Sequence, residues 1–198
     1  GFTQSGKMVG QTFDDEFRYA RNRIIVATFS SNVHRIQQVV DSAVKYNRKV
    51  AVIGRSMINV VNIAMELGYL SVPEGVLIDI DETNNYSANE IVIITTGSQG
   101  EPMSALTRMA MNDHKKVGIM PGDTVIISAT PIPGNEKTVG KVINELMKLG
   151  AEVVYEKMYD DLKPEKKIYS ERIALIEPLI QTLGEGLTPI QTKEHPPL

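Results

Sequence analysis

The sequence predicts an α/β fold with three layers, in which helices cover both faces of a mostly parallel sheet. Short runs rich in β-branched residues recur along the chain, and each is followed by a turn and a segment of helical periodicity. The strand-like runs are continuously apolar rather than alternating, which is typical of strands covered on both faces. These two observations together favour a parallel sheet between two layers of helices.

Six apolar runs are expected to form the strands. In chain order they cover residues 24–29, 50–53, 76–80, 91–95, 124–128 and 152–155. Right-handed crossovers between parallel strands place the loops that follow the strands along one edge of the sheet. An open α/β sheet binds its ligands at this edge.

Amphipathic segments lie between these runs. Residues 33–45 carry apolar side chains at helical spacing, and the same pattern recurs at about 57–67, 103–110 and 137–149. Gly150 follows the last segment, and glycine favours the position directly after a helix. Strand and helix therefore alternate along most of the chain.

The character of the chain changes after residue 155. A charged connector at 160–167 is followed by a segment, 173–183, that could form one more helix. We therefore place the α/β domain at residues 11–158 and a C-terminal segment of unclear origin at residues 159–198.

Composition limits the chemistry. The chain has 198 residues, no Cys and three His that are far apart, which excludes disulfides, thiolate nucleophiles and Cys-based zinc sites and argues against an imidazole-based metal centre. Its 21 Lys and Arg against 24 Asp and Glu give a net charge of −3. This charge argues against a wholly basic nucleic-acid protein but permits a local positive groove.

No stretch approaches the roughly 18 apolar residues of a membrane span. Residues 1–7 also lack the apolar core of a signal peptide. We therefore expect a cytoplasmic protein without a membrane partner.

Four predicted strands end in polar loops that could bind a ligand. In the first loop, Ser31 or Asn32 could cap the following helix, whose free N–H groups attract anions. His34 and Arg35 lie within the first turn of that helix. An ordinary capped helix with two solvated side chains explains the same residues.

The second loop follows the strand predicted at residues 50–53. Gly54 suits a tight turn, and Ser56 is expected to be the N-cap of the next helix. Arg55 lies between them, where it could reach a ligand or remain an ordinary surface residue.

The third loop, at residues 95–102, contains two glycines that let a ligand approach the backbone closely. It is neither a P-loop nor a dinucleotide fingerprint. Arg108, in the following helix, could reach a phosphate or a neighbouring carboxylate. The candidate residues of the loop itself are Gly97, Ser98, Gln99, Gly100 and Glu101.

The fourth loop, at residues 128–136, is stiffened by two prolines, and Gly134 permits a sharp bend. Asn135 could cap the next helix. A rigid turn from strand to helix is a sufficient explanation of this loop alone. A ligand site is favoured because four such loops would converge on one edge.

Taken together, the loops resemble a family signature. They read Ser-Asn-Val-His-Arg-Ile-Gln-Gln at 31–38, Gly-Arg-Ser-Met at 54–57, Thr-Thr-Gly-Ser-Gln-Gly-Glu-Pro-Met-Ser-Ala-Leu at 95–106 and Pro-Ile-Pro-Gly-Asn-Glu at 131–136. This ordered set resembles the β-CASP domain of the ribonuclease J family. Residues 1–10 resemble the linker that leads into that domain from a metallo-β-lactamase domain.

The resemblance implies a Rossmann-like β-CASP domain inserted into a metallo-β-lactamase domain, with a cleft for single-stranded RNA between the two. It implies two zinc ions in the metallo-β-lactamase half, which activate water for phosphodiester hydrolysis. It also implies 5′-to-3′ and internal cleavage of RNA in mRNA decay and rRNA maturation. The implied partners are RNA, the metallo-β-lactamase half, and a second copy or related subunit.

Some family motifs are absent from this sequence. They are the His-x-His-x-Asp-His metal motif and the Ser-Gly-His segment expected after Tyr155, and Gly6 stands where family members commonly have Glu. We therefore expect this chain to be the RNA-clamping half, with no metal, cofactor or catalytic residue of its own and no hydrolysis by itself.

The loops are expected to hold the RNA backbone through helix N-termini, arginines and close main-chain approach, without reading its sequence. The residues predicted to do so are Ser31, Asn32, His34, Arg35, Arg55, Ser56, Gly97, Ser98, Gln99, Gly100, Glu101, Arg108 and Asn135.

Two other functions would use the same loops. A small α/β enzyme could bind a nucleotide or phosphometabolite, which would give mononucleotide binding without a partner domain. A non-catalytic interaction module could instead expose the Met-containing helix at 103–111, although Met at helical spacing is more often buried.

Overall fold

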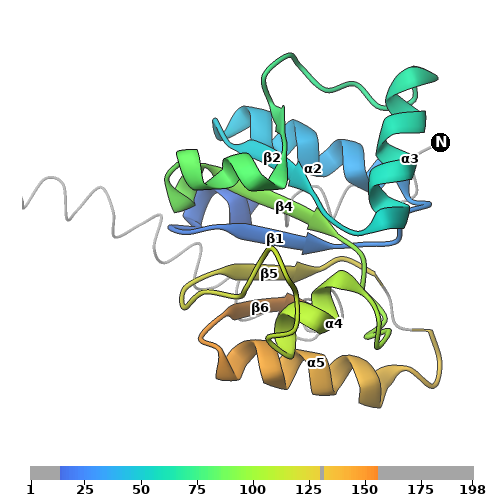
Figure 1. Cartoon of the computed structure of the whole chain (residues 1–198), viewed down its shortest axis with the longest axis vertical. Coiled ribbons are helices and arrows are strands. Elements are labelled where there is room, and N and C mark those ends of the chain that lie inside the picture. The colour runs from blue at the N-terminus through green and yellow to red at the C-terminus, as the bar shows by residue number, and fades with distance from the viewer. Residues whose placement is uncertain (1–13, 130–131, 156–198) are drawn as a thin grey trace, which may run out of the picture. The chain divides into compact units, whose positions relative to one another are not determined.

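The structure is a computed structural model that describes residues 14–129 and 132–155 (Figure 1). The strands are β1 (Ile24–Ala27), β2 (Lys49–Val52), β3 (Leu77–Ile78), β4 (Ile91–Thr95), β5 (Thr124–Ile127) and β6 (Glu152–Tyr155). The helices include α2 (Val33–Lys45), α3 (Arg55–Glu66), α4 (Ala105–Ala110) and α5 (Glu136–Lys148), with the 3-10 helices η1 (Ile80–Asn85) and η2 (Ala88–Glu90). A further helix covers residues 14–19.

The strands form one parallel sheet in the order β3-β2-β4-β1-β5-β6. From β1 the chain runs outward through β2 to β3, returns to β4 beside β1, and continues to the other edge through β5 and β6. The direction of winding therefore reverses between β1 and β4. The sheet confirms the predicted fold class, and this reversal marks where an open α/β sheet binds its ligands.

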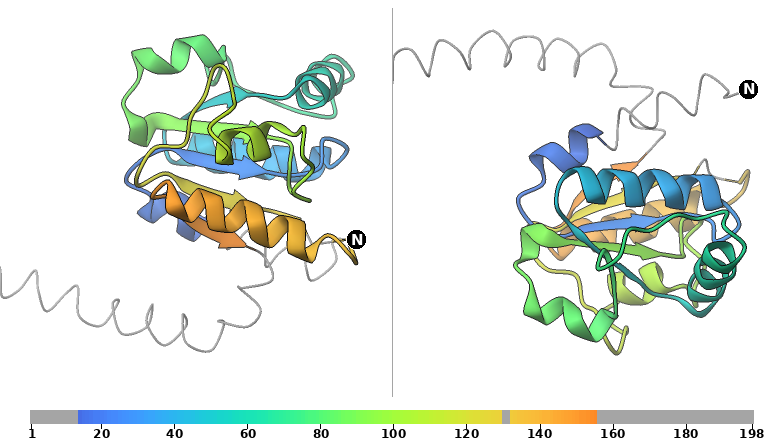
Figure 2. Two further views of the ribbon diagram at one scale, coloured as in Figure 1. Left: turned by 60° about the horizontal axis from the view of Figure 1, so that its bottom comes forward. Right: turned by 90° about the horizontal axis from the view of Figure 1, so that it is seen from above.

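Helices cover both faces of the sheet, as predicted (Figure 2). α2 lies on one face together with the helix at residues 14–19, where the ring of Phe17 lies 6.3 Å from the ring of Tyr46 at the end of α2. α4 and α5 lie on the opposite face and contact each other. All residues of β1, β4 and β5 are consequently buried.

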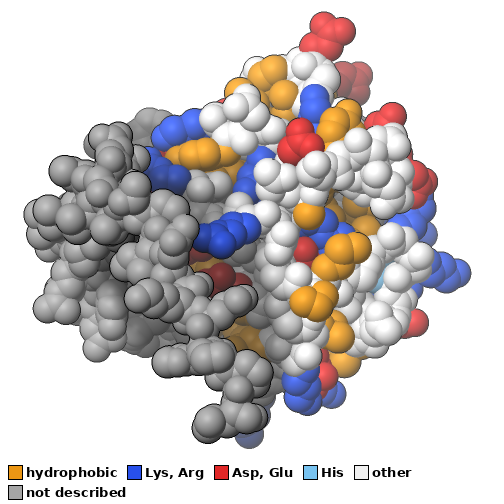
Figure 3. Space-filling view, turned by 90° about the vertical axis from the view of Figure 1, so that its left-hand side faces the viewer, with side chains coloured by type: hydrophobic (Ala, Val, Ile, Leu, Met, Phe, Trp, Pro, Cys, Tyr) orange, Lys and Arg blue, Asp and Glu red, His pale blue; other side chains and the backbone are white. Residues whose placement is uncertain are grey.

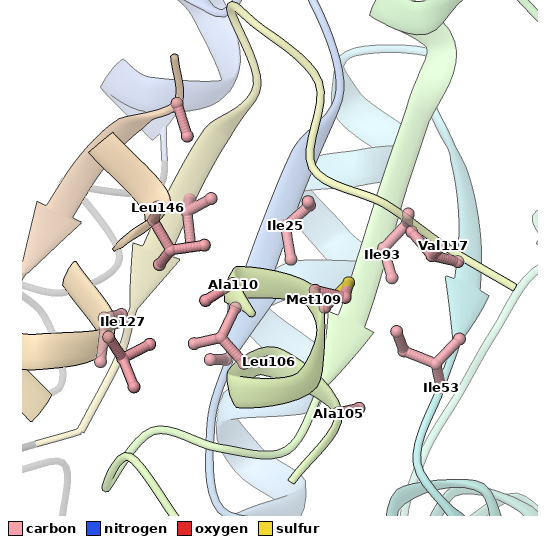
Figure 4. Packing of buried hydrophobic residues seen from close by; sticks show 14 of the residues in the cluster. Ile25, Ile53, Ile93, Ala105, Leu106, Met109, Ala110, Val117, Ile127 and Leu146 are labelled. Atoms are coloured by element: carbon pink, nitrogen blue, oxygen red, sulfur yellow. The ribbon is translucent and has the colours of Figure 1, made fainter. Parts of the chain in front are cut away.

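The core on the side of α4 and α5 combines alternate strand residues with the apolar faces of the two helices (Figure 4). Ile25, Ile93 and Ile127, from three strands, lie around Leu106 of α4 and Leu146 of α5. Because side chains alternate along a strand, the residues between them face α2. Burial on both faces explains why these strands read as continuously apolar in the sequence.

β3 is shorter than the strand predicted at this point. Only Leu77–Ile78 pairs with β2. The strand ends at Asp79, whose carboxylate accepts a hydrogen bond from the N–H of Asp81 (2.8 Å), while the N–H of Asp79 donates to the carboxylate of Glu82 (3.0 Å). This capping box starts η1 where the strand was expected to continue.

Buried charges hold the amino ends of the strands, at the edge opposite to the loops that follow them. Arg23 donates to the Asp123 carboxylate from Nε (2.9 Å) and from Nη2 (2.5 Å). Arg48 donates to the backbone oxygens of Ala20 and Asn22, and burial lowers the pKa of its guanidinium. Figure 3 shows this side of the molecule, where basic, acidic and hydrophobic side chains are interspersed.

The predicted linker at 1–10 and the predicted C-terminal segment at 159–198, with the helix expected at 173–183, lie outside the described residues. The predicted domain boundaries therefore stay a prediction. Within residues 14–129 and 132–155, no helix is long and apolar enough to cross a lipid bilayer.

Candidate nucleic-acid interface

A cleft of about 930 Å³ opens at the carboxyl ends of β1, β2 and β4, beside the reversal of the strand order. The segments that line it follow these three strands in the sequence, and a fourth comes from the connection between α4 and β5. Five residues predicted from the sequence line this cleft together: Arg55, Ser56, Gly97, Glu101 and Arg108. The predicted convergence of loops at one edge is thus confirmed for the loops after β1, β2 and β4.

The first turn of α3 forms one wall of the cleft. Its N-cap is Gly54 (φ 96°), not Ser56 as predicted, because Ser56 is already the second residue of the helix. Glycine has no side chain to cap the free N–H groups of this turn, so they remain available to an anion. A Cβ at Gly54 would lie 3.0 Å from Thr96 Oγ1, so glycine also lets the turn approach the opposite wall.

The loop between β4 and α4 forms the opposite wall. Gly97 has a φ of 112°, and a Cβ there would lie 2.8 Å from the Cβ of Leu106. The Ser104 hydroxyl caps α4 by accepting a hydrogen bond from the N–H of Thr107 (3.3 Å). The N–H of Leu106 donates to the carbonyl of Thr96 (3.2 Å). These contacts fix backbone and hydroxyl groups at the edge of the cleft.

Arg108 and His114 line the cleft from α4 and from the connection that follows it. Arg108 donates from Nη2 to the backbone oxygen of Asp113 (2.9 Å), which holds the guanidinium in place. His114 Nδ1 accepts a hydrogen bond from the N–H of Val117 (3.1 Å), so the proton of the neutral ring is assigned to Nε2. Burial and the charge of Arg108 lower the pKa of His114, although Asp113 opposes them.

The lowered pKa of His114 predicts stability that is lost in acid. The unfolded chain binds a proton at this residue at higher pH than the folded protein does, so the free energy of unfolding falls as the pH drops below about 6.5. His114→Asn keeps an acceptor for the N–H of Val117 but cannot titrate, so it should flatten this part of the profile. Urea unfolding between about pH 5 and 8 measures the slope. An unchanged slope in the variant would contradict the prediction.

Five other predicted residues do not line the cleft. Asn32 caps α2 as predicted, because its Oδ1 accepts a hydrogen bond from the N–H of Arg35 (3.1 Å). Ser31 and His34 are exposed, Arg35 is partly buried, and Ser98 is buried in the loop after β4. Contact between these residues and RNA stays a prediction.

The remaining predicted residues, Gln99, Gly100 and Asn135, tie the loop after β4 to α5. Gln99 Oε1 accepts hydrogen bonds from the N–H of Ile132 (2.7 Å) and from the side-chain amide of Asn135 (3.4 Å). Asn135 is the N-cap residue of α5, as predicted, but its side chain makes no capping hydrogen bond. A Cβ at Gly100 would lie 2.9 Å from the backbone of Thr138, so glycine lets the loop pack on the first turn of α5.

Several residues that line the cleft were not predicted from the sequence. Phe29 was expected in the strand and Met103 in the following helix, yet both lie outside those elements and are 36% and 84% exposed. Phe29 could have been found by its position in the loop that follows β1, two residues after Ala27. His114 had no such signal, because it reaches the cleft only through the path of the connection between α4 and β5.

The cleft carries groups that suit a phosphate-containing ligand. Arg55 and Arg108 are positive, and the opposing Glu101 carboxylate accepts a hydrogen bond from the N–H of Gln99 (3.2 Å). Hydroxyl groups, including that of Ser56, and the free N–H groups of α3 add donors, which is the usual composition of a nucleic-acid backbone contact. Among the described residues, no cluster of three His, Asp or Glu side chains could hold a metal ion.

Comparisons with known proteins show the family of this chain. A family model described as "Ribonuclease J, beta-CASP domain" matches residues 21–146. The chain is 51% identical to ribonuclease J of Helicobacter pylori over 156 residues, which are 79% of this chain and 23% of the relative. It is 46% identical to ribonuclease J 1 of Streptococcus pyogenes over 157 residues, which are 79% of this chain and 28% of the relative.

A third relative, ribonuclease J2 of Bacillus subtilis, is 42% identical over 155 residues, which are 78% of this chain and 28% of the relative. The chain thus spans about a quarter of the length of these relatives. Because the family model matches more than half of the sequence, the chain belongs to the ribonuclease J beta-CASP domain family.

Proposed function

We propose that this chain forms the RNA-clamping wall of a ribonuclease J-like enzyme. The cleft at the carboxyl ends of β1, β2 and β4 is the observation that carries the proposal. Membership of the beta-CASP family and the names of the relatives favour RNA over other phosphate-containing ligands. In this proposal the described residues hold the RNA backbone and do not act on the bond that is cleaved.

Each wall of the cleft contributes a different kind of phosphate contact. Arg55 and the free N–H groups at the start of α3 offer charge and directed donors on one side. Arg108 lies on the other side. Gly97 lets this wall pack closely on the start of α4, because a side chain there would collide with Ser104 and Leu106. None of these groups requires a particular base, so we expect binding without sequence preference.

The proposal extends to the reaction and its setting. A metallo-β-lactamase half, joined to this chain, would hold two zinc ions that activate water for phosphodiester hydrolysis. The enzyme would degrade RNA from the 5′ end and cut it internally, in mRNA decay and rRNA maturation in the cytoplasm. This chain alone would not hydrolyse RNA, and a second copy or a related subunit is a further partner. The resemblance of the four loops to the family supports these points.

The variant Arg55→Ala tests the role of the cleft. It should weaken the binding of a short single-stranded RNA by about fivefold at low salt, as expected for about 1 kcal/mol from one exposed ionic contact. It should also reduce the slope of log affinity against log salt by about 0.7, because one phosphate contact is lost. Fluorescence anisotropy with a labelled oligonucleotide at several salt concentrations measures both quantities.

Arg21→Ala is the matched control, because Arg21 is an exposed arginine just before β1, at the amino edge of the sheet. This variant should change neither the affinity nor the salt slope. Equal effects of the two variants, or no effect of Arg55→Ala, would overturn the proposal. Calorimetry can also measure the binding of a mononucleotide. If the chain binds the mononucleotide more tightly than RNA, the result would instead favour a nucleotide-dependent α/β enzyme.

A further inference from the structure

The outer face of α5 carries a row of exposed lysines. Lys137, Lys141 and Lys148 line a shallow surface groove of about 730 Å³, with Asn144 and the exposed side chain of Met147 between them. The opposite face of α5 is buried in the core through Val139, Val142 and Leu146. The helix therefore presents its basic side chains to solvent, along a surface that the cleft does not include.

The groove is positive although the whole chain is not. Its only acidic lining residue among those described is Glu145, which pairs with Lys148 (2.8 Å). Within the described part of the chain, Lys137 and Lys141 form no ion pair with an acidic side chain. Among residues 14–129 and 132–155, no acidic side chain pairs with these two cations, on a chain with a net charge of −3.

The shape of the groove suits an extended, flexible polyanion. Lys137 and Lys141 are one turn apart, so their Cβ atoms are separated by about 6 Å, and Lys148 extends the row to about 16 Å along the helix. Gly140 lies in the floor, and a Cβ there would meet nothing within 4 Å, so the floor is open. Long lysine side chains can follow a ligand along such a row without fixing its sequence.

The loop after β4 connects this groove to the cleft. Gly97 and Glu101 of the loop line the cleft, whereas Gly100 packs on the backbone of Thr138, next to Lys137. Gln99 is bonded to Asn135 directly before α5. An RNA strand that leaves the cleft along this loop would therefore arrive at the first turn of α5. This continuity favours RNA over an acidic protein as the occupant.

We propose that the lysine groove on α5 binds the phosphate backbone of single-stranded RNA that extends beyond the cleft. The proposal rests on the proposed function, because it assumes that the cleft holds RNA. It adds a second contact region, which would make long RNA bind more tightly than short RNA through a higher effective concentration at the groove.

The triple variant Lys137→Gln, Lys141→Gln and Lys148→Gln tests this proposal in the 198-residue chain. Anisotropy titrations compare oligonucleotides of about 6 and about 24 nucleotides at several salt concentrations. For the long RNA, affinity should fall about tenfold and the salt slope should decrease by about 2, because up to three phosphate contacts are lost. The short RNA should bind the variant and the parent chain equally.

Three further variants separate the effect of charge from the effect of position. Lys45→Gln, Lys49→Gln and Lys115→Gln remove the same charge from other surfaces and should affect long RNA much less. Replacing the three groove lysines with arginine should preserve the binding of long RNA. Glu145→Gln removes the acidic partner of Lys148 and should strengthen the binding of long RNA.

The outcomes separate the two proposals. Unchanged affinity of the groove variant for long RNA, or an equal loss in the control triple variant, would overturn the groove proposal. The same holds if the parent chain prefers an acidic peptide to long RNA in competition. Failure of the proposed function would appear elsewhere, as an unchanged affinity of Arg55→Ala for short RNA.

Discussion

Replacing Gly97 with alanine (Gly97→Ala) is expected to lower the free energy of unfolding by about 3 kcal/mol. With a φ of 112°, Gly97 has a backbone conformation that residues with a side chain rarely adopt, and an added Cβ would collide with the Ser104 hydroxyl. It would also lie 2.8 Å from Leu106 Cβ. Neither neighbour can withdraw easily, because Ser104 caps α4 and Leu106 is fully buried.

Chemical denaturation of Gly97→Ala beside Gly75→Ala separates backbone strain from collision. Gly75 also has a positive φ, 74°, but a Cβ there would meet nothing within 4 Å. Gly75→Ala should therefore cost only about 1 kcal/mol, from strain alone. Equal losses in the two variants would show that the contacts of Gly97 with α4 do not matter for stability.

Asp123→Ala is expected to lower the free energy of unfolding by about 3 to 4 kcal/mol. The substitution would leave the guanidinium of Arg23, whose side chain is 12% exposed, without its counter-charge. It would also remove the acceptor for the N–H of Met120, which donates to the Asp123 carboxylate (2.8 Å). A buried charge without a partner is far more costly than the absence of the whole pair.

The double variant Arg23→Leu and Asp123→Ala tests this reason. It should recover about half of the loss seen in Asp123→Ala, because no buried charge remains. Asp14→Ala is the control for an exposed pair, since Asp14 contacts Lys45 at the surface, and should cost less than about 1 kcal/mol. A loss in Asp123→Ala no larger than that in Asp14→Ala would contradict the prediction.

The regular elements could be predicted from the sequence because their signals are local. The runs that became β1, β4 and β5 are apolar throughout, as the burial of both their faces requires. The helical pattern of residues 33–45 matches α2 in full, and Gly150 (φ 87°) follows α5 as expected. In these segments the pattern of apolar residues in the sequence corresponds directly to the faces that the fold buries.

The errors occurred where a polar side chain had a distant partner or a competing neighbour. Asn135 is the N-cap residue of α5 as predicted, but its side-chain amide reaches Gln99, 36 positions away in the sequence, and does not cap the helix. The N-cap of α3 is Gly54 and not Ser56, and the absence of a Cβ at Gly54 lets the turn pack against Thr96. Both outcomes depend on contacts between loops that only the folded sheet brings together.

The same distinction applies to the candidate site. The location of the cleft followed from the parallel sheet, and Arg55, Gly97 and Arg108 followed from the loops after its strands. His114 could not be predicted, because it depends on how the chain leaves α4. The bond between Arg108 and the backbone of Asp113 turns the connection back toward the cleft directly before His114.

The shortness of β3 also affects how this domain behaves in a crowded solution. An edge strand exposes backbone groups that can pair with a strand of another molecule, which is a common start of aggregation. β3 offers only Leu77 and Ile78 before η1 turns the chain away. A second molecule would find too few consecutive backbone groups to extend the sheet on this side. By ending β3 at this point, the capping box at Asp79 also makes it harder for a second molecule to add a strand to this edge of the sheet.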